Sequence, residues 1–122
     1  MMAEYGDIDI CLDPFPYNGS TTTCDALTMG VPVVTLAGTA LAGRAGLMFL
    51  AAAGMDEWSG RSKQEYVRIA CDAARDVRRL ADLRRELRAR FLASPACDAP
   101  RFARAFEDLY RTAWRRFAAA GR

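Results

Sequence analysis

The fold of this chain is decided by the stretch Asp13-Pro14-Phe15-Pro16-Tyr17-Asn18-Gly19-Ser20-Thr21-Thr22-Thr23-Cys24-Asp25-Ala26-Leu27. Residues 7–12, immediately before it, alternate polar and apolar side chains, a pattern typical of a β-strand. Two prolines and an Asn-Gly pair then predict a loop, and the run of hydroxyl residues predicts a helix from Ser20 to Gly30. The stretch is therefore the loop and helix of a strand–loop–helix unit.

The predicted start of this helix offers a site for an anion. The first backbone N–H groups of a helix have no acceptor within the helix, and the helix dipole adds positive potential at the same place. Ser20, Thr21 and Thr22 add hydroxyl groups that can bind a phosphate. Asp25 shares a helical face with Thr21 and Thr22, where its carboxylate can accept hydrogen bonds from ribose hydroxyls.

Ordinary helix capping is the alternative interpretation of the same residues. Ser20 with Thr23, or Thr22 with Asp25, has the spacing of an N-cap residue and its partner in the first turn. Such a cap would account for one hydroxyl and one acid. Spacing alone leaves both the cap and the phosphate site open.

A family resemblance appears at these residues. The quoted stretch and its continuation resemble the C-terminal catalytic region of the O-GlcNAc transferase/SPINDLY-like glycosyltransferases, through Thr28-Met29-Gly30-Val31-Pro32-Val33-Val34-Thr35-Leu36-Ala37-Gly38 and Ala42-Gly43-Arg44. A looser similarity extends from Ser94-Pro95 to the end of the chain. The resemblance implies that Thr21 and Thr22 contact the diphosphate of a sugar-nucleotide donor and that Asp25 contacts its ribose. Ser20 departs from the family members that have histidine there.

The resemblance implies an α/β fold, a partial Rossmann-like parallel sheet from the C-terminal domain of a GT-B glycosyltransferase, with flanking helices and a helical C-terminus. With 122 residues and 52% hydrophobic content, the chain can form one small core but not two Rossmann-like domains. We therefore expect residues 1–122 to be a single partial domain, the C-terminal part of the donor-nucleotide-binding domain.

The function implied by the resemblance is transfer of a sugar from a nucleoside diphosphate donor, with a UDP-sugar preferred, to a protein hydroxyl. The remaining partners implied are a protein acceptor, the missing N-terminal catalytic half and tetratricopeptide repeats, in the cytoplasm. We assign no catalytic residue to this chain and expect it to be inactive alone. The donor-binding residues predicted are Ser20, Thr21, Thr22 and Asp25. A non-catalytic nucleotide-binding or protein-interaction module is the alternative.

Composition excludes several other classes. The chain has no histidine, which removes a Ser-His-Asp arrangement and histidine metal ligation, and we expect neither a cofactor nor a metal ion. Its 17 basic and 15 acidic residues are nearly balanced, which does not favour nucleic acid or an anionic membrane. No apolar run is long enough to span a membrane. The four cysteines are widely spaced, so we expect free buried thiols.

Further elements follow along the chain. We expect a buried strand over 31–36, parallel to the first strand, then a helix over 41–53 with Gly43 and Gly46 allowing close packing. A short third strand is expected near 54–58, and a helix over 62–74 with a capping box of Ser62 and Glu65. If upstream strands are absent, the sheet exposes an unpaired edge, and we expect self-association through it.

Two C-terminal helices complete the prediction. In residues 76–93 the apolar positions recur at helical spacing, and the intervening arginines with Asp82 and Glu86 favour a solvated, salt-bridged face over a nucleic-acid site. The last helix begins at Asp98 and has an apolar stripe that includes Phe102, Phe106, Leu109, Ala113 and Phe117. For Tyr110 and Trp114 we expect core positions, with docking to a missing partner as the alternative.

Overall fold

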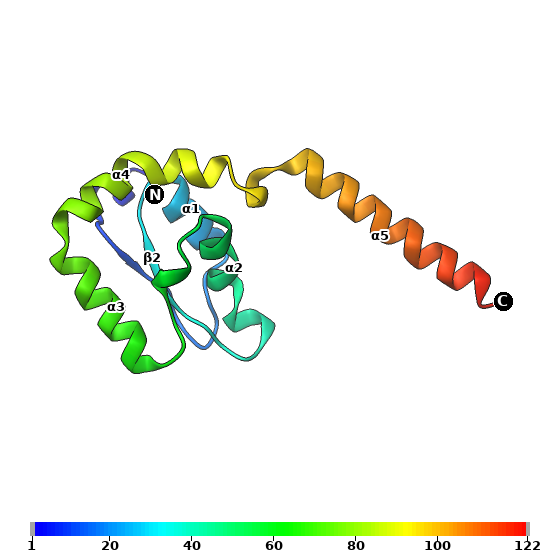
Figure 1. Ribbon diagram of the computed structural model, residues 1–122, viewed down its shortest axis with the longest axis horizontal. Coiled ribbons are helices and arrows are strands. Elements are labelled where there is room, and N and C mark those ends of the chain that lie inside the picture. The colour runs from blue at the N-terminus through cyan, green and yellow to red at the C-terminus, as the bar shows by residue number, and fades with distance from the viewer. Residues whose placement is uncertain (1, 122) are drawn as a thin grey trace.

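The computed structural model describes residues 2–121 and contains a three-stranded parallel sheet (Figure 1). The strands are β1 (Cys11–Leu12), β2 (Val33–Leu36) and β3 (Ser59–Gly60), in the order β1-β2-β3. Cys11 lies opposite Val33, and Thr35 lies opposite Ser59. The predicted parallel pair and the α/β class are confirmed.

Helices connect and cover these strands. The α-helices are α1 (Thr21–Thr28), α2 (Ala45–Ala52), α3 (Lys63–Arg75), α4 (Val77–Leu92) and α5 (Ala99–Ala119). Four 3-10 helices are η1 (Ala3–Asp7), η2 (Leu41–Gly43), η3 (Asp56–Trp58) and η4 (Pro95–Cys97). In Figure 1, α2 and α3 lie on opposite sides of β2, and both pack against that strand. Among residues 2–121, no helix is both long enough and apolar enough to cross a lipid bilayer.

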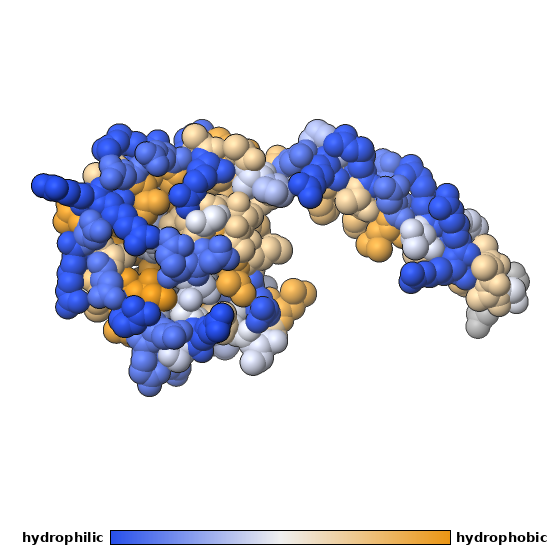
Figure 2. All heavy atoms as spheres, viewed as in Figure 1, coloured by the Kyte–Doolittle hydropathy of each residue, from blue (hydrophilic) through white to orange (hydrophobic). Residues whose placement is uncertain are grey.

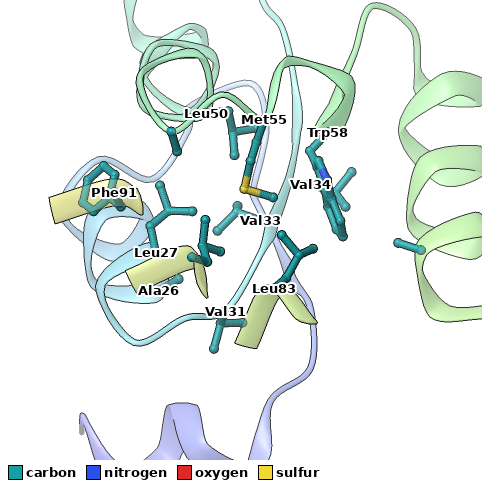
Figure 3. Packing of buried hydrophobic residues seen from close by; sticks show 13 residues of the cluster. Ala26, Leu27, Val31, Val33, Val34, Leu50, Met55, Trp58, Leu83 and Phe91 are labelled. Atoms are coloured by element: carbon teal, nitrogen blue, oxygen red, sulfur yellow. The ribbon is translucent and has the colours of Figure 1, made fainter. Parts of the chain in front are cut away.

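The core lies between the sheet and its helices, with Leu27 of α1, Leu50 of α2 and Leu87 of α4 all fully buried. Met55 and Val33 lie near Leu27 and Leu50, and Phe91 closes one end of this cluster (Figure 3). Burial of a side chain of this size stabilises the fold by about 1.5–3 kcal/mol. The continuous apolar run in β2 is buried because helices cover both faces of a central parallel strand.

Several predicted boundaries need correction. The first strand is shorter than residues 7–12, because the segment up to Asp7 belongs to η1. The third strand follows residues 54–58 rather than lying within them, at Ser59–Gly60. The helix predicted over 41–53 is divided into η2 and α2, and its large apolar residues Leu41 and Met48 are exposed. The glycine prediction holds, since a Cβ at Gly43 would lie 2.9 Å from the Pro16 carbonyl oxygen.

Helix ends follow the sequence more closely. Gly30 has φ +76°, in the left-handed region that favours glycine just after a helix. Ser62 caps α3 by accepting a hydrogen bond from the Glu65 amide at 3.1 Å, and Glu65 in turn accepts from the Arg61 amide at 2.7 Å. Asp98 caps α5 by accepting from the Arg101 amide at 2.9 Å. The predicted caps of these two helices are confirmed.

Three arginines of α4 donate to backbone carbonyls of other elements; of these, Arg88 and Arg90 are exposed, as expected of a solvated face, and Arg84 is half-buried. Arg84 donates to the carbonyl oxygens of Tyr5 and Gly6, and Arg88 donates to that of Thr28, at the end of α1. Arg90 has the helical spacing of a salt bridge with Glu86, but it donates to carbonyls that follow α2. A guanidinium is stabilised at a helix C-terminus by the unpaired carbonyls and the negative end of the dipole. These arginines therefore join α4 to earlier elements, which argues further against a nucleic-acid site.

Helix α5 extends away from the rest of the molecule, and all of its residues are exposed (Figure 1). In Figure 2 one side of the projecting helix is mainly hydrophilic and its lower side carries hydrophobic residues. The large side chains of this apolar stripe are exposed by 46–69%, and they are Phe102, Phe106, Leu109, Tyr110, Trp114 and Phe117. The expectation that Tyr110 and Trp114 are core residues is wrong, because the described chain has no element facing this side of α5.

The thiols differ in part from expectation. All four cysteines are free, as predicted. However, Cys71 and Cys97 are exposed, and Cys11 and Cys24 are half-buried. Burial raises the pKa of the Cys11 and Cys24 thiols, so both are held further in the protonated form. The prediction of buried thiols is therefore wrong for Cys71 and Cys97.

Candidate functional site

The predicted anion site lies at the carboxyl edge of the sheet. The loop of residues 13–19 leaves the end of β1, and residues 37–40 leave the end of β2. The first loop contacts η2, which follows the second connection, because the Asn18 amide donates to the Ala42 carbonyl at 2.9 Å. In parallel α/β sheets, ligands bind beyond the carboxyl ends of the strands. The start of α1 is therefore at the expected edge.

The four predicted site residues fall within the first turns of α1 and its entry. Ser20, Thr21 and Thr22 are exposed, and Asp25 is half-buried one turn further along. Ser20 is the N-cap residue of α1, but its side chain accepts no hydrogen bond from the helix. Neither predicted capping pair is formed: the buried Thr23 donates to the Gly19 carbonyl at 3.0 Å, and Thr22 lies inside α1 and not at its N-cap. The hydroxyls of Ser20, Thr21 and Thr22 therefore remain accessible at a helix start.

Asp13 supports this helix start and was not predicted as a site residue. Its side chain is only 3% exposed, and both carboxylate oxygens accept hydrogen bonds at 2.6 Å, one from the Gly19 amide and one from the Thr35 hydroxyl. Burial raises the pKa of Asp13, and the two hydrogen bonds only partly offset that effect. The Asp-Pro pair looks like a simple strand terminator in the sequence, so no local pattern reveals this role.

Tyr5 also lies beside the site, in a segment to which the sequence assigned no function. Its hydroxyl is 3.5 Å from the Thr22 carbonyl oxygen. The pKa of Tyr5 is raised by burial, and then by the neighbouring Cys11 and Asp25. The 3-10 turn of η1 therefore brings an aromatic side chain close to the proposed ribose carboxylate.

Two hollows flank the loop of residues 13–19. One of about 320 Å³ is lined by residues that include Tyr5, Leu12, Asp13 and Thr22, next to the start of α1. The other, of about 380 Å³, lies between the loops that follow β2 and β3, and its lining residues include Phe15, Gly38, Arg61 and Lys63. A third hollow, of about 470 Å³ near Asp9 and Val77, is lined by none of these hydroxyl residues.

No group of three or more acidic, cysteine or histidine side chains in residues 2–121 is placed to hold a metal ion. Arg44, whose position near a helix start and the loop after β2 left contact with a donor or pairing with an acid open, donates to the Gly38 carbonyl at 3.1 Å. It therefore helps to shape the loop after β2. The chemistry that the described residues offer is binding of an anion and a polyhydroxyl group.

A parallel sheet whose carboxyl edge carries a hydroxyl-rich helix start is an arrangement found in nucleotide-binding α/β domains. Comparison with known proteins identifies which one. The profile of glycosyl transferase family 41 matches residues 5–106. The chain belongs to glycosyl transferase family 41.

Relatives and a solved structure agree with this assignment. Over 94 residues the chain is 45% identical to a protein of Hordeum vulgare and 46% identical to one of Oryza sativa subsp. japonica, both named "Probable UDP-N-acetylglucosamine–peptide N-acetylglucosaminyltransferase SPINDLY". The match covers 77% of this chain and 10% of each relative. A Thermobaculum terrenum O-GlcNAc transferase structure superposes with a TM-score of 0.85 at 46% identity, covering 93% of this chain and 22% of that one.

Proposed function

We propose that this chain supplies the donor-diphosphate site of a protein O-glycosyltransferase. The observation that carries the proposal is the uncapped, hydroxyl-rich start of α1 at the carboxyl edge of the sheet, in a chain of family 41. The backbone amides of the first turn and the hydroxyls of Thr21 and Thr22 bind the diphosphate, with Ser20 beside them. The carboxylate of Asp25 accepts hydrogen bonds from the ribose.

This arrangement stabilises a leaving group. In sugar transfer from a nucleoside diphosphate, negative charge increases on the diphosphate as the glycosidic bond breaks. Fixed amides and hydroxyls directed at that charge lower the barrier without reorganising during the reaction. We propose no metal ion or cofactor for this step, because the helix start itself supplies the positive potential. The names of the relatives support a UDP-sugar as donor.

The proposal places the remaining functions in a longer protein. The chain spans about 10% of the SPINDLY relatives and 22% of the Thermobaculum chain. An N-terminal catalytic half, a protein acceptor site and tetratricopeptide repeats belong to this proposal, as does a cytoplasmic location. The exposed apolar stripe of α5 supports a large missing partner, since six such side chains are costly to leave in water. A non-catalytic nucleotide-binding or interaction module is the second candidate.

A titration of the isotopically labelled chain with UDP, GDP and inorganic phosphate tests the donor site. NMR shifts centred on residues 13–25 are expected with UDP, with a dissociation constant on the order of a millimolar because the rest of the donor cleft is absent. Phosphate alone should perturb the first turn of α1 but leave Asp25 unchanged. Shifts confined to other residues, or none with UDP, would reject the proposed site and leave a simple helix start.

A further inference from the structure

We propose that Asp13 is a positioning residue for the diphosphate site, which it serves by holding the start of α1 against β2. The inference rests on the proposed function, because it concerns how the same site is kept in its binding geometry. Asp13 itself is buried and does not contact the donor in this proposal. It acts through Gly19, which immediately precedes the hydroxyl residues.

Asp13 is held at four points by three other parts of the fold. Its amide donates to the Val34 carbonyl at 2.9 Å, and its carbonyl accepts from the Tyr66 hydroxyl at 3.1 Å. One carboxylate oxygen accepts from the Gly19 amide and the other from the Thr35 hydroxyl, each at 2.6 Å. The contacts with β2 and α3 thus fix the position of the carboxylate. The carboxylate in turn fixes the Gly19 amide at the entry of α1.

Gly19 is where this support meets the proposed phosphate site. A Cβ at Gly19 would lie 3.2 Å from the Asp13 carboxylate and would also collide with the Thr22 hydroxyl. The carboxylate and the hydroxyl therefore approach the same backbone residue closely. The Thr23 hydroxyl, which donates to the Gly19 carbonyl, fixes that residue from the helix side. A shift of the Gly19 amide would consequently move Thr22.

The space around the carboxylate is equally restricted. A Cβ at Gly46 of α2 would overlap both the Asp13 carboxylate and the Thr35 hydroxyl. The close approach of α2 leaves little room for another rotamer of Asp13. A buried carboxylate is costly unless its lone pairs are satisfied, so retaining one here is consistent with a geometric requirement rather than with stability. Sites need such a second layer of support to hold binding groups in place.

Substitutions at Asp13 separate positioning from simple stability. Asp13→Asn keeps an oxygen that can accept from the Gly19 amide and an NH₂ that can donate to the Thr35 hydroxyl, whereas Asp13→Ala removes both contacts. UDP is titrated by NMR against each variant at a temperature where its spectrum shows a folded protein. We expect the dissociation constant to rise about fivefold or more in Asp13→Ala and to change less than about twofold in Asp13→Asn.

Two further variants make the test independent of folding. Thr35→Val removes one hydrogen bond to the carboxylate and should weaken UDP binding in the same direction, which keeps the test valid if Asp13→Ala does not fold. Asp9→Asn changes an exposed acid just before β1 and should leave binding unchanged. The Gly19 amide proton should move upfield in Asp13→Ala, because it loses a short bond to a carboxylate.

The outcomes distinguish this inference from the proposed function. If folded Asp13→Ala and Thr35→Val bind UDP as tightly as wild type, Asp13 has only a structural role and the inference is overturned. Failure of the wild type to bind UDP would reject the proposed function, and with it the inference that depends on it. Weak binding in Asp13→Ala that is restored in Asp13→Asn supports both.

Discussion

The guanidinium of Arg90 donates to the Ala53 carbonyl at 2.6 Å, and so connects α4 to the C-terminal end of α2. It also donates to the Gly54 carbonyl at 2.9 Å. Arg90→Ala should lower the free energy of unfolding by about 1–3 kcal/mol, since it leaves two carbonyls without their charged donor. Urea unfolding measures the difference. Arg85→Ala, which removes a surface pair with Asp82, is the control and should cost less than about 1 kcal/mol; equal losses would contradict the role of Arg90.

Asp25→Ala should weaken UDP binding without weakening phosphate binding. The carboxylate is proposed to accept hydrogen bonds from the ribose, and its loss should cost about 1–3 kcal/mol of UDP affinity if that group is desolvated in the complex. The measurement is the NMR titration of wild type and variant with UDP and with inorganic phosphate. Cys24→Ser, on the same helix, is the matched control and should bind as wild type. If Asp25→Ala binds UDP as tightly as wild type, Asp25 has no role in binding the ribose.

The chain alone should show no sugar transfer. Orienting the donor against the acceptor lowers the activation barrier by roughly several kcal/mol. The described residues form only one side of the cleft and cannot hold both substrates. Purified protein is incubated with UDP- and GDP-sugars and a panel of peptides, and products are detected by mass spectrometry against a heat-denatured control. Specific transfer above that control would show that the described residues form a complete active site.

Self-association should depend on α5 more than on the open edge of β1. The two-residue strand offers only a few hydrogen bonds of about 1 kcal/mol each, whereas each large apolar side chain of α5 can contribute about 1.5–3 kcal/mol on burial. Light scattering should detect a dimer or larger species. Phe106→Ser with Trp114→Ser should reduce its mass more than Leu12→Lys does. If the wild type stays monomeric at every concentration, neither α5 nor the edge of β1 mediates self-association.

Asp13 should give the fold a distinctive pH dependence. Burial raises its pKa in the folded state, so in the window above about pH 4 the folded protein keeps a proton that the unfolded chain has lost. Stability from this group therefore falls as pH rises through that window. Urea unfolding of wild type and Asp13→Asn is measured at a series of pH values. As the pH rises, the unfolding free energy of wild type should fall relative to that of Asp13→Asn. A flat difference would mean that the carboxyl group has its ordinary pKa.

Local sequence predicted the elements whose cause is local. The prolines and Asn-Gly of the loop and Gly30 after α1 indicate the loop and the helix end correctly because backbone conformation depends on nearest neighbours, whereas the alternation of residues 7–12 indicated a longer strand than Cys11–Leu12. The capping box of Ser62 and Glu65 was correct for the same reason. The motif around Thr21 and Thr22 also identified the family, which the family profile confirms, and the role of these hydroxyls at the helix start stays a prediction.

What depended on distant contacts could not be read from the sequence. The role of Asp13 arises from Thr35 and Tyr66, which lie 22 and 53 residues away along the chain. Arg90 has the spacing of a surface salt bridge with Glu86, yet its guanidinium reaches Ala53 instead. The stripe of α5 has the periodicity of a buried helix, but burial requires a second surface that the described chain does not provide. The sequence by itself determined the local elements and the family, whereas tertiary packing decided which polar groups meet, because hydrogen-bond partners and burial are set by neighbours in space.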